Sequence, residues 1–244
     1  MAETELIQTA EKGEKRGVRN LIGPNLNFAA TEAYKLLRTN ILFSFSDEGE
    51  GRVIGVTSSI QNEGKSLTAC NLAYTLAEAD KKVLLLEADL RKPTVAVKLG
   101  LARGLGLTNA LISSVELEDY VQQSDLIHGL DVITSGDIPP NPSELLSSNR
   151  MAQIMQELKQ KYDYIVVDLP PVTVVSDTLA ISKNLDGVVI VVRGGISEKH
   201  MLSEALRQLK MASVRILGFV FRGNDRDTKA YRKKYEKYYQ SYEK

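Results

Sequence analysis

Short apolar runs alternate with longer helical stretches along most of this chain, and this alternation constrains its fold more than any other feature. The runs are rich in β-branched residues and apolar throughout, which predicts strands covered on both faces. Residues 31–41 repeat their apolar positions at helical spacing, and further helices are predicted at 64–79, 149–161 and 198–212. The pattern predicts an α/β fold: a mostly parallel central sheet, helices on both faces, and ligands at the carboxyl ends of the strands. The predicted strands span residues 52–57, 83–87, 130–134, 164–168, 187–192 and 216–221.

Charge and length bound the possible functions. The 244 residues suit one or two domains, and 31 basic side chains balance 31 acidic ones, so the overall charge gives no reason to expect nucleic-acid binding. No apolar run approaches the roughly 20 residues that span a bilayer. The N-terminal residues lack the apolar core of a signal peptide, and a single cysteine cannot form an internal disulfide. These features predict a cytoplasmic protein.

Composition divides the chain into three segments. Residues 1–25 are polar and charged without an apolar period, which predicts a flexible N-terminal segment. Residues 26–225 carry the whole strand and helix pattern and are expected to form one domain. Residues 226–244 hold five of the ten tyrosines and no Leu, Ile, Val, Met or Phe. This segment cannot pack like the rest, and we expect a flexible tail.

A phosphate site is predicted where the first strand meets the next helix, in the segment TSSIQNEGKS at residues 57–66. Its Gly-Lys-Ser ending and its context fit a P-loop, although Ser59 stands where the generic pattern has glycine. Lys65 can reach the β and γ phosphates of a nucleotide, and the Ser66 hydroxyl can bind Mg²⁺. The competing interpretation is an ordinary strand-to-helix turn with a chance Gly-Lys-Ser. The predicted ATP-binding residues are Ser58, Ser59, Ile60, Gln61, Asn62, Glu63, Gly64, Lys65, Ser66 and Leu67.

Carboxylates follow two other predicted strands. LLLEADLRKP places Glu87 and Asp89 just past one strand, and IVVDLPP places Asp168 at the end of another. Because these strand ends share the edge of the sheet that carries the P-loop, all three acids are expected near Mg²⁺. Each acid alone would more commonly be a helix N-cap or a solvated loop residue, but their joint occurrence favours a shared site. Pro170 and Pro171 restrict the backbone directly after Asp168.

Five segments together resemble the bacterial tyrosine kinases of polysaccharide export. They are TSSIQNEGKS, LLLEADLRKP, IVVDLPP, SGDIPPNPSELL and the tyrosine-rich tail. The resemblance covers about residues 26–244. It implies a P-loop NTPase fold with a deviant Walker A motif, and an ATP-dependent tyrosine autokinase that regulates polysaccharide synthesis or export.

The resemblance also implies roles for individual residues. The first three motifs correspond to Walker A, Walker A′ and Walker B. The family usually has proline and glycine at the positions of Gln61 and Asn62, and aspartate at the position of Glu87. The implied catalytic residues are Lys65, Glu87 and Asp89, and the implied metal ligands are Ser66, Asp89 and Asp168.

Transfer to tyrosine makes modest chemical demands. Phosphoryl transfer requires mainly positioning and charge stabilisation, which Lys65 and Mg²⁺ would supply. A tyrosine hydroxyl with a pKa of about 10 needs no strong base. Glu87 or Asp89 would therefore suffice as the proton acceptor.

The tail supplies the expected acceptors. Its tyrosines are autophosphorylation sites by the resemblance, although their near-helical spacing also allows an aromatic stripe that docks on the domain or on a partner. Residues 228–244 hold six basic and two acidic side chains, a balance of +4 that several phosphates, at about −1.5 to −2 each, would reverse. We expect phosphorylation in trans within a ring-shaped homo-oligomer. The acceptors are Tyr231, Tyr235, Tyr238, Tyr239 and Tyr242.

Self-association and partners are also implied by the resemblance. Glu32, Lys35 and Arg38 lie at three-residue steps on a predicted helix and match an E-x-x-R-x-x-R oligomerisation motif, with Lys35 in place of the first arginine. The alternative is a solvated charged face. The implied partners are a membrane-embedded polysaccharide co-polymerase adaptor as activator, a cognate phosphotyrosine phosphatase, and protein substrates of polysaccharide biosynthesis. The adaptor would recruit the chain to the inner face of the cell membrane.

Two other functions share this fold. A partitioning or cell-division ATPase would act as a nucleotide-switched dimer, but such ATPases have a lysine where this chain has Ile60. A non-catalytic scaffold would bind ATP without forming phosphotyrosine. Phosphotyrosine formed from Mg-ATP distinguishes the kinase from both.

Overall fold

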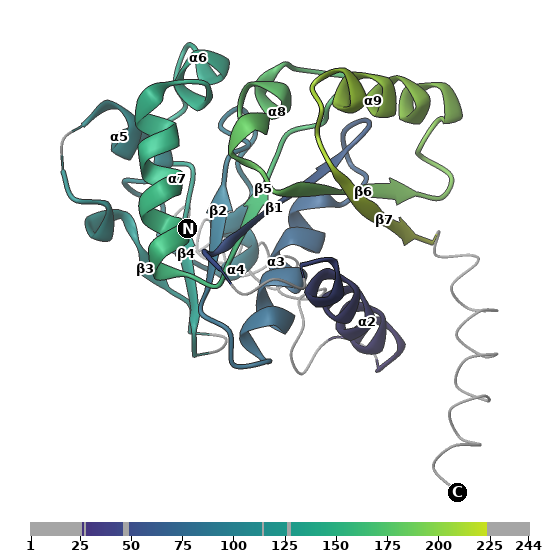
Figure 1. Cartoon of the computed structure of the whole chain (residues 1–244), viewed down its shortest axis with the longest axis horizontal. Coiled ribbons are helices and arrows are strands. Elements are labelled where there is room, and N and C mark those ends of the chain that lie inside the picture. The colour runs from purple at the N-terminus through teal and green to yellow at the C-terminus, as the bar shows by residue number, and fades with distance from the viewer. Residues whose placement is uncertain (1–25, 27, 46–48, 114, 126–127, 224–244) are drawn as a thin grey trace, which may run out of the picture.

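The computed structural model describes residues 26, 28–45, 49–113, 115–125 and 128–223. Seven strands form one sheet in the order β3-β4-β2-β5-β1-β6-β7 (Figure 1). Neighbouring strands are parallel except β3 and β4, which pair antiparallel at one edge. The predicted mostly parallel sheet is confirmed. The strands are β1 Arg52–Ser58, β2 Val83–Glu87, β3 Gln122–Gln123, β4 Leu130–Ile133, β5 Tyr164–Asp168, β6 Gly187–Arg193 and β7 Ile216–Arg222.

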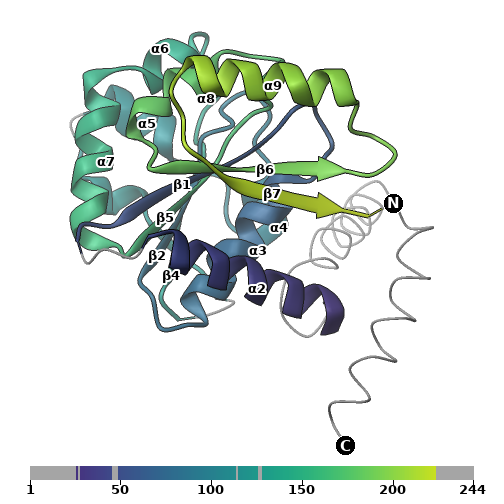
Figure 2. The ribbon, with the colours of Figure 1, turned by 45° about the vertical axis from the view of Figure 1, so that its right-hand side comes forward.

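Helices cover both faces of the sheet, as predicted. In Figure 2, α9 lies above the sheet, and α2 and α3 lie below it. The buried side chains of α7 and α9 pack on one face, and those of α2, α3 and α4 pack on the other. The helices are α2 Phe28–Ser44, α3 Lys65–Ala77, α4 Val95–Leu99, α5 Leu107–Ile112, α6 Pro142–Leu146, α7 Asn149–Lys161, α8 Asp177–Ala180 and α9 Lys199–Met211, with short 3₁₀ turns η2 Leu117–Tyr120 and η3 Ser182–Asn184.

Residue spacing explains how the two layers form. In β5, Ile165 and Val167 belong to the core under α7, whereas Val166 between them faces the core that contains α3. α7 begins where the Ser148 hydroxyl accepts a hydrogen bond from the Met151 N–H at 3.2 Å, which satisfies one of the free amides of the first turn. Its apolar residues recur at helical intervals and are all buried on one side. They are Met151, Ile154, Met155 and Leu158.

The expectation that strands are covered on both faces is wrong for β7. Phe219 is 54% exposed and Phe221 is 70% exposed. They pair in register with Ile190 and Val192 of β6. β7 is the outermost strand on this side of the sheet, and no helix within the described ranges covers these two phenylalanines. An apolar run therefore does not distinguish an edge strand from a central one.

The short elements were not predicted. α4, α5, α6 and α8 have four to six residues each, and β3 has two. Such lengths hold less than two helical turns, so their apolar residues show no recognisable period. In the part of the chain that the structure describes, no helix is both long enough and apolar enough to cross a membrane.

The two predicted end segments, 1–25 and 226–244, lie outside the described residues. The sheet and its helices fall within the predicted domain at 26–225. The proposed boundaries of the three segments remain predictions.

Candidate functional site

The loop between β1 and α3 forms one wall of a cavity of about 640 Å³ at the carboxyl end of the sheet. Asn62 and Gly64 have φ angles of 64° and 95°, so the loop needs residues that tolerate the left-handed region. A side chain at position 64 would also meet the guanidinium of Arg222, since an added Cβ would lie 1.6 Å from its Nη1. α3 begins at Lys65, and its first backbone amides therefore point toward this loop.

A buried carboxylate fastens the loop from inside. Glu63 is fully buried, and its carboxylate accepts the Ile60 N–H at 2.8 Å and the Ser59 hydroxyl at 3.1 Å. The Ser197 hydroxyl, from the segment after β6, donates to the same carboxylate. Glu63 thus ties the loop to the neighbouring strand, and its charge is directed into the loop.

The structure separates the ten predicted ATP-binding residues into two groups. One group lines the cavity, and the other shapes the loop behind it. Ser58 belongs to the second group, because its hydroxyl donates to the Ile60 carbonyl at 2.7 Å. The lining residues are Gln61, Asn62, Gly64, Lys65, Ser66 and Leu67, and the shaping residues are Ser58, Ser59, Ile60 and Glu63.

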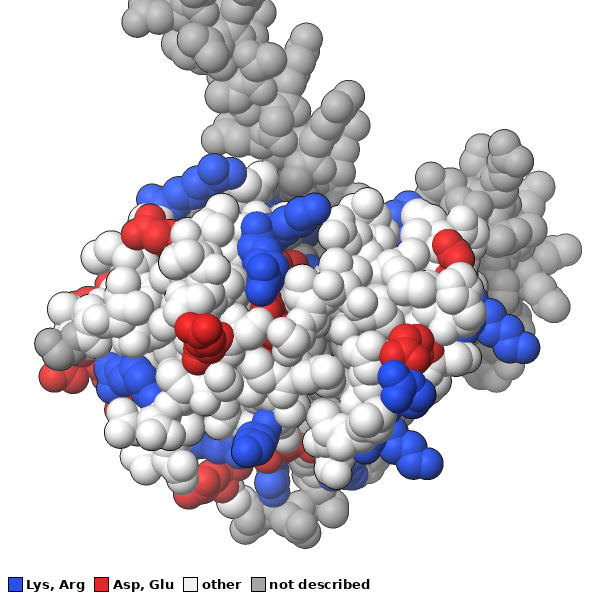
Figure 3. Space-filling view, turned by 90° about the horizontal axis from the view of Figure 1, so that it is seen from above, with Lys and Arg blue, Asp and Glu red and all other residues white. Residues whose placement is uncertain are grey.

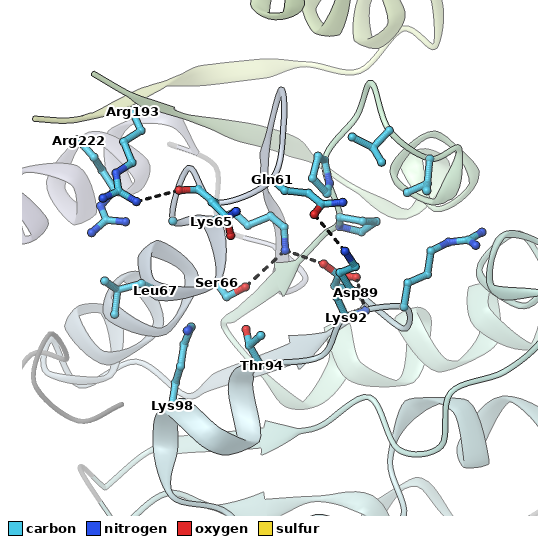
Figure 4. Close-up of a pocket in the computed structure, with 17 residues that line it drawn as sticks. Gln61, Lys65, Ser66, Leu67, Asp89, Lys92, Thr94, Lys98, Arg193 and Arg222 are labelled. Carbon is cyan, nitrogen blue, oxygen red and sulfur yellow. Dashed lines mark hydrogen bonds and ion pairs between the residues drawn. The ribbon is translucent and has the colours of Figure 1, made fainter. Parts of the chain in front are cut away.

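Lys65 lines the cavity and points toward Asp89 (Figure 4). Its Nζ lies 2.6 Å from Oδ2 of Asp89 and 3.9 Å from Oδ1 of Asp168. Burial lowers the pKa of Lys65, but the charges of Asp168 and Asp89 outweigh burial and hold that pKa above its usual value. The lysine is therefore a cation, which suits it to bind phosphate.

Asp168 is the unsatisfied acid of the site. Both its carboxylate oxygens are buried and accept no hydrogen bond of ordinary geometry from the described residues. Burial raises the pKa of Asp168 to about 6, an effect that Lys65 and the Ser66 hydroxyl partly offset. A buried carboxylate with so little donor contact is costly unless a cation completes it.

These residues fit Mg²⁺. This ion prefers oxygen ligands, keeps several waters and commonly takes only one or two carboxylates together with substrate phosphates. The bare oxygens of Asp168, the carboxylate of Asp89 and the hydroxyl of Ser66 lie around one lysine and offer such a set. Within the described ranges, no group of three or more His, Cys, Asp or Glu residues could hold a metal ion by itself. A site completed by nucleotide phosphates does not require one.

Glu87 has a different environment from the one we expected. Its carboxylate accepts three backbone N–H groups, from Thr94 at 2.5 Å, Val95 at 2.6 Å and Ser135 at 3.1 Å. Burial raises the pKa of Glu87, and these three donors oppose that effect. Glu87 does not line the cavity. The Glu87 oxygens are therefore occupied by backbone amides at the start of α4 and just after β4. A catalytic role for Glu87 remains a prediction.

The cavity is strongly basic. Six of its lining side chains are lysine or arginine, whereas Asp89 is the single acid among them. Elsewhere charges of both signs are interspersed, as on the face in Figure 3. A surplus of cations in one cavity favours a polyanionic ligand such as a nucleoside triphosphate. The basic residues are Lys65, Arg91, Lys92, Lys98, Arg193 and Arg222.

Sequence reasoning missed most of these cations. Arg91 makes two hydrogen bonds with the buried Asp177, at 2.8 and 3.0 Å, and so anchors the loop that carries Asp89. Arg193 donates to the Asn62 carbonyl at 3.0 Å. The available signals were the Arg-Lys pair directly after the acidic motif and an arginine that ends an apolar strand. Neither signal shows that these residues line a cavity unless the order of the strands in the sheet is known.

The three residues predicted for self-association have contacts within the chain. Lys35 pairs with Glu32 at 3.1 Å on the surface of α2. Arg38 donates to the Thr75 carbonyl of α3 at 2.7 Å and lies 3.3 Å from the carboxylate of Glu78, which directly follows α3. Arg38 therefore helps attach α2 to α3. A role for the three residues in oligomers remains a prediction, and the five tail tyrosines lie outside the described residues.

Comparisons with known proteins agree with this arrangement. A family described as an AAA domain matches residues 51–213. Tyrosine-protein kinase YwqD of Bacillus subtilis (strain 168) is 42% identical over 193 residues, which cover 79% of this chain and 81% of that protein. The solved kinase domain of Escherichia coli tyrosine kinase ETK matches with a TM-score of 0.75 and 34% identity, over 80% of this chain and 75% of that one.

A more distant neighbour bears on the fold alone. The septum site-determining protein MinD from Pyrococcus horikoshii OT3, solved with Mg-ADP, matches with a TM-score of 0.60. Its sequence identity is 23%, over 70% of each chain. The shared sheet is therefore common to several classes of nucleotide-binding protein, and the fold by itself does not select among them.

Proposed function

The chain belongs to the bacterial tyrosine kinase family, and on this premise we propose that it transfers the γ-phosphoryl group of ATP to tyrosines of its own C-terminal tail. One observation carries the proposal: a partly buried, charged Lys65 at the start of α3 stands beside the bare carboxylate of Asp168. Such a pair suits a nucleotide phosphate and its metal ion. The acceptors would be the five tyrosines of the 226–244 segment.

The nucleotide phosphates would lie against the amides at the start of α3. Lys65 would turn from Asp89 toward the β and γ phosphates, an exchange of one anionic partner for another. Ser66, Asp89 and Asp168 would hold Mg²⁺, which when bound neutralises charge on the phosphate oxygens. The rigid attachment of the loop through Glu63 keeps its amides in position before the nucleotide arrives.

The transfer step needs a proton acceptor, and Asp89 is the candidate that the geometry supports. It lines the cavity, whereas Glu87 does not. The acceptor oxygen attacks the γ phosphorus, the bond to the β–γ bridging oxygen breaks, ADP leaves, and the phenol proton passes to the Asp89 carboxylate. Once Lys65 turns to the phosphates, the Oδ2 atom that it contacts is available for this proton.

The partitioning or cell-division ATPase is not favoured. Its characteristic lysine would stand at Ile60, whose backbone N–H is bonded to Glu63. No charged group of this chain occupies that position. The similar curated proteins are named tyrosine-protein kinases.

Assembly and partners extend the proposal. We infer that the tail of one subunit is phosphorylated by a neighbour in a homo-oligomeric ring. A membrane-embedded adaptor of polysaccharide chain-length control would activate the chain at the inner face of the membrane, and a phosphotyrosine phosphatase would reset it. Trans phosphorylation predicts that the rate per molecule rises with protein concentration, and a rate that is independent of concentration would contradict it.

The decisive experiment is a substitution of Lys65. Purified Lys65→Met protein, incubated with Mg-ATP, should lose at least about 100-fold of its phosphotyrosine formation, because the charge on the γ phosphate is no longer balanced. Mass spectrometry locates the phosphotyrosines. Lys159→Met is a matched control, since Lys159 forms a 3.0 Å ion pair with Asp186 away from the cavity. Undiminished tail phosphorylation in Lys65→Met would contradict the proposal.

A further inference from the structure

The order of the strands places acidic residues on one side of the cavity and two arginines on the other. β2 and β5, which carry Asp89 and Asp168 at or just past their ends, lie on one side of β1, and β6 and β7 lie on the other. Arg193 and Arg222 end β6 and β7 and line the cavity from that second side. A nucleotide whose γ phosphate faces the acids must therefore receive its acceptor from the side of β2 and β5.

An apolar wall stands on that side. The segment after β5 contributes four apolar residues to the lining, whereas the remaining side chains of the cavity are polar or charged apart from Leu67. Val174 is 47% exposed, and Pro170 and Pro171 beside it are buried. A nucleoside triphosphate has no apolar group near its γ phosphate that could cover this wall. The four residues are Pro170, Pro171, Val174 and Val175.

The wall is held firmly in place. The Pro170 carbonyl accepts hydrogen bonds from the Thr57 and Thr178 hydroxyls, each at 2.7 Å. The Thr173 hydroxyl donates to the Ser59 carbonyl at 2.7 Å, directly inside the phosphate loop. Val174 is therefore fixed relative to the phosphate loop by its neighbour Thr173. Because hydrogen bonds already hold the backbone of this segment, little conformational entropy is lost when a ligand packs against the exposed Val174 side chain.

We propose that Val174, with Pro170 and Pro171 beneath it, packs against the phenol ring of the acceptor and makes the site selective for tyrosine. The inference rests on the proposed kinase function and adds the acceptor subsite to it. A tyrosine places a flat apolar ring between its backbone and its hydroxyl, so the ring can cover the wall while the oxygen reaches the γ phosphate. Serine or threonine carries its hydroxyl at Cβ and has no ring to cover the wall. Val174 is thus a specificity-determining residue.

The test compares three valine variants with a peptide acceptor of the sequence 228–244. Val174→Ser should raise the KM for the peptide about three- to tenfold, since one side-chain contact with the ring is lost. The kcat, the KM for ATP and the midpoint of thermal unfolding should remain unchanged. Val174→Leu keeps an apolar wall and should restore the KM of the unaltered protein. Val97→Ser is the matched control, because Val97 is 48% exposed on α4 and does not line the cavity.

The outcomes separate this inference from the proposed function. If the unaltered protein forms phosphotyrosine and Val174→Ser has the same peptide KM as Val97→Ser, the acceptor subsite is wrong and the kinase proposal stands. If the unaltered protein forms no phosphotyrosine on peptide or tail, the kinase proposal fails. A change in the KM for ATP in Val174→Ser would also overturn the inference, because it would assign the wall to the nucleotide.

Discussion

The ends of β2 and β5 place two acids side by side in very different states. Glu87 and Asp168 pair in register on adjacent parallel strands, and both are fully buried. Glu87 accepts three backbone N–H groups, whereas Asp168 accepts no hydrogen bond of ordinary geometry within the described chain. Burial is therefore the same for both, and hydrogen bonding separates them. Glu87 joins three backbone segments, whereas the oxygens of Asp168 are available to a ligand.

The neighbouring loops produce this difference. The chain after β2 turns so that α4 directs its first amides at Glu87, and Ser135 after β4 adds a third donor. The chain after β5 enters Pro170 and Pro171, which have no N–H to donate. Asp168 thus keeps its oxygens bare, and Lys65 is its nearest basic partner at 3.9 Å.

The largest expected effect is on Asp168. Asp168→Asn should reduce phosphotyrosine formation at least about 100-fold, because an amide supplies weaker ligation to Mg²⁺, and should leave the unfolding free energy unchanged or higher. Asp186→Asn is the control: its carboxylate accepts the Val53 N–H at 2.7 Å, so the variant should lose stability and keep activity. Activity assays and urea titrations measure both. Strong destabilisation by Asp168→Asn would mean that Asp168 stabilises the fold as Glu87 does, and would contradict the contrast between Asp168 and Glu87.

The stability should also depend on pH through Asp168. Its pKa rises from 3.8 in an ordinary setting to about 6 in the folded protein. Between these values the unfolded chain has lost a proton that the folded protein keeps, so the unfolding free energy falls as the pH rises through this window, by on the order of 2–3 kcal/mol. Urea unfolding without nucleotide or Mg²⁺ measures the unfolding free energy of the unaltered protein and of Asp168→Asn at pH 4 and pH 7. The difference between the two proteins at each pH isolates the contribution of Asp168. A difference that stays constant or rises with pH would contradict the raised pKa.

The smallest effect is expected for Glu87→Asp, which supplies the residue that the family resemblance implies at this position. The shorter side chain should not reach all three donors, and we expect a loss of about 1–2 kcal/mol in unfolding free energy with only a modest fall in kcat. Urea titration and peptide phosphorylation measure the two quantities. If Glu87 accepts the proton instead, Glu87→Asp should keep its stability and match or exceed the original rate, while Glu87→Gln should be inactive.

Much of the fold was predictable because it depends on local periodicity. All six predicted strands and the long helices α3, α7 and α9 begin or end within about two residues of the predicted limits. The meeting of Lys65, Asp89 and Asp168 was predictable as well, since parallel strands bring their carboxyl ends to one edge. The contact partners of Glu87 were not predictable, because its donors come from residues 94, 95 and 135.

The sequence by itself determined a parallel sheet with a phosphate loop and acids at one edge, because a strand's residue spacing and the position of a motif after it are properties of a single segment. The tertiary structure decided which buried acid is bound by amides and which is bare, which cations surround the cavity, and on which side Val174 stands. These outcomes depend on the order of strands in space and on donors distant in sequence. Neither the strand order nor the identity of distant donors can be predicted from the residue pattern of a single segment.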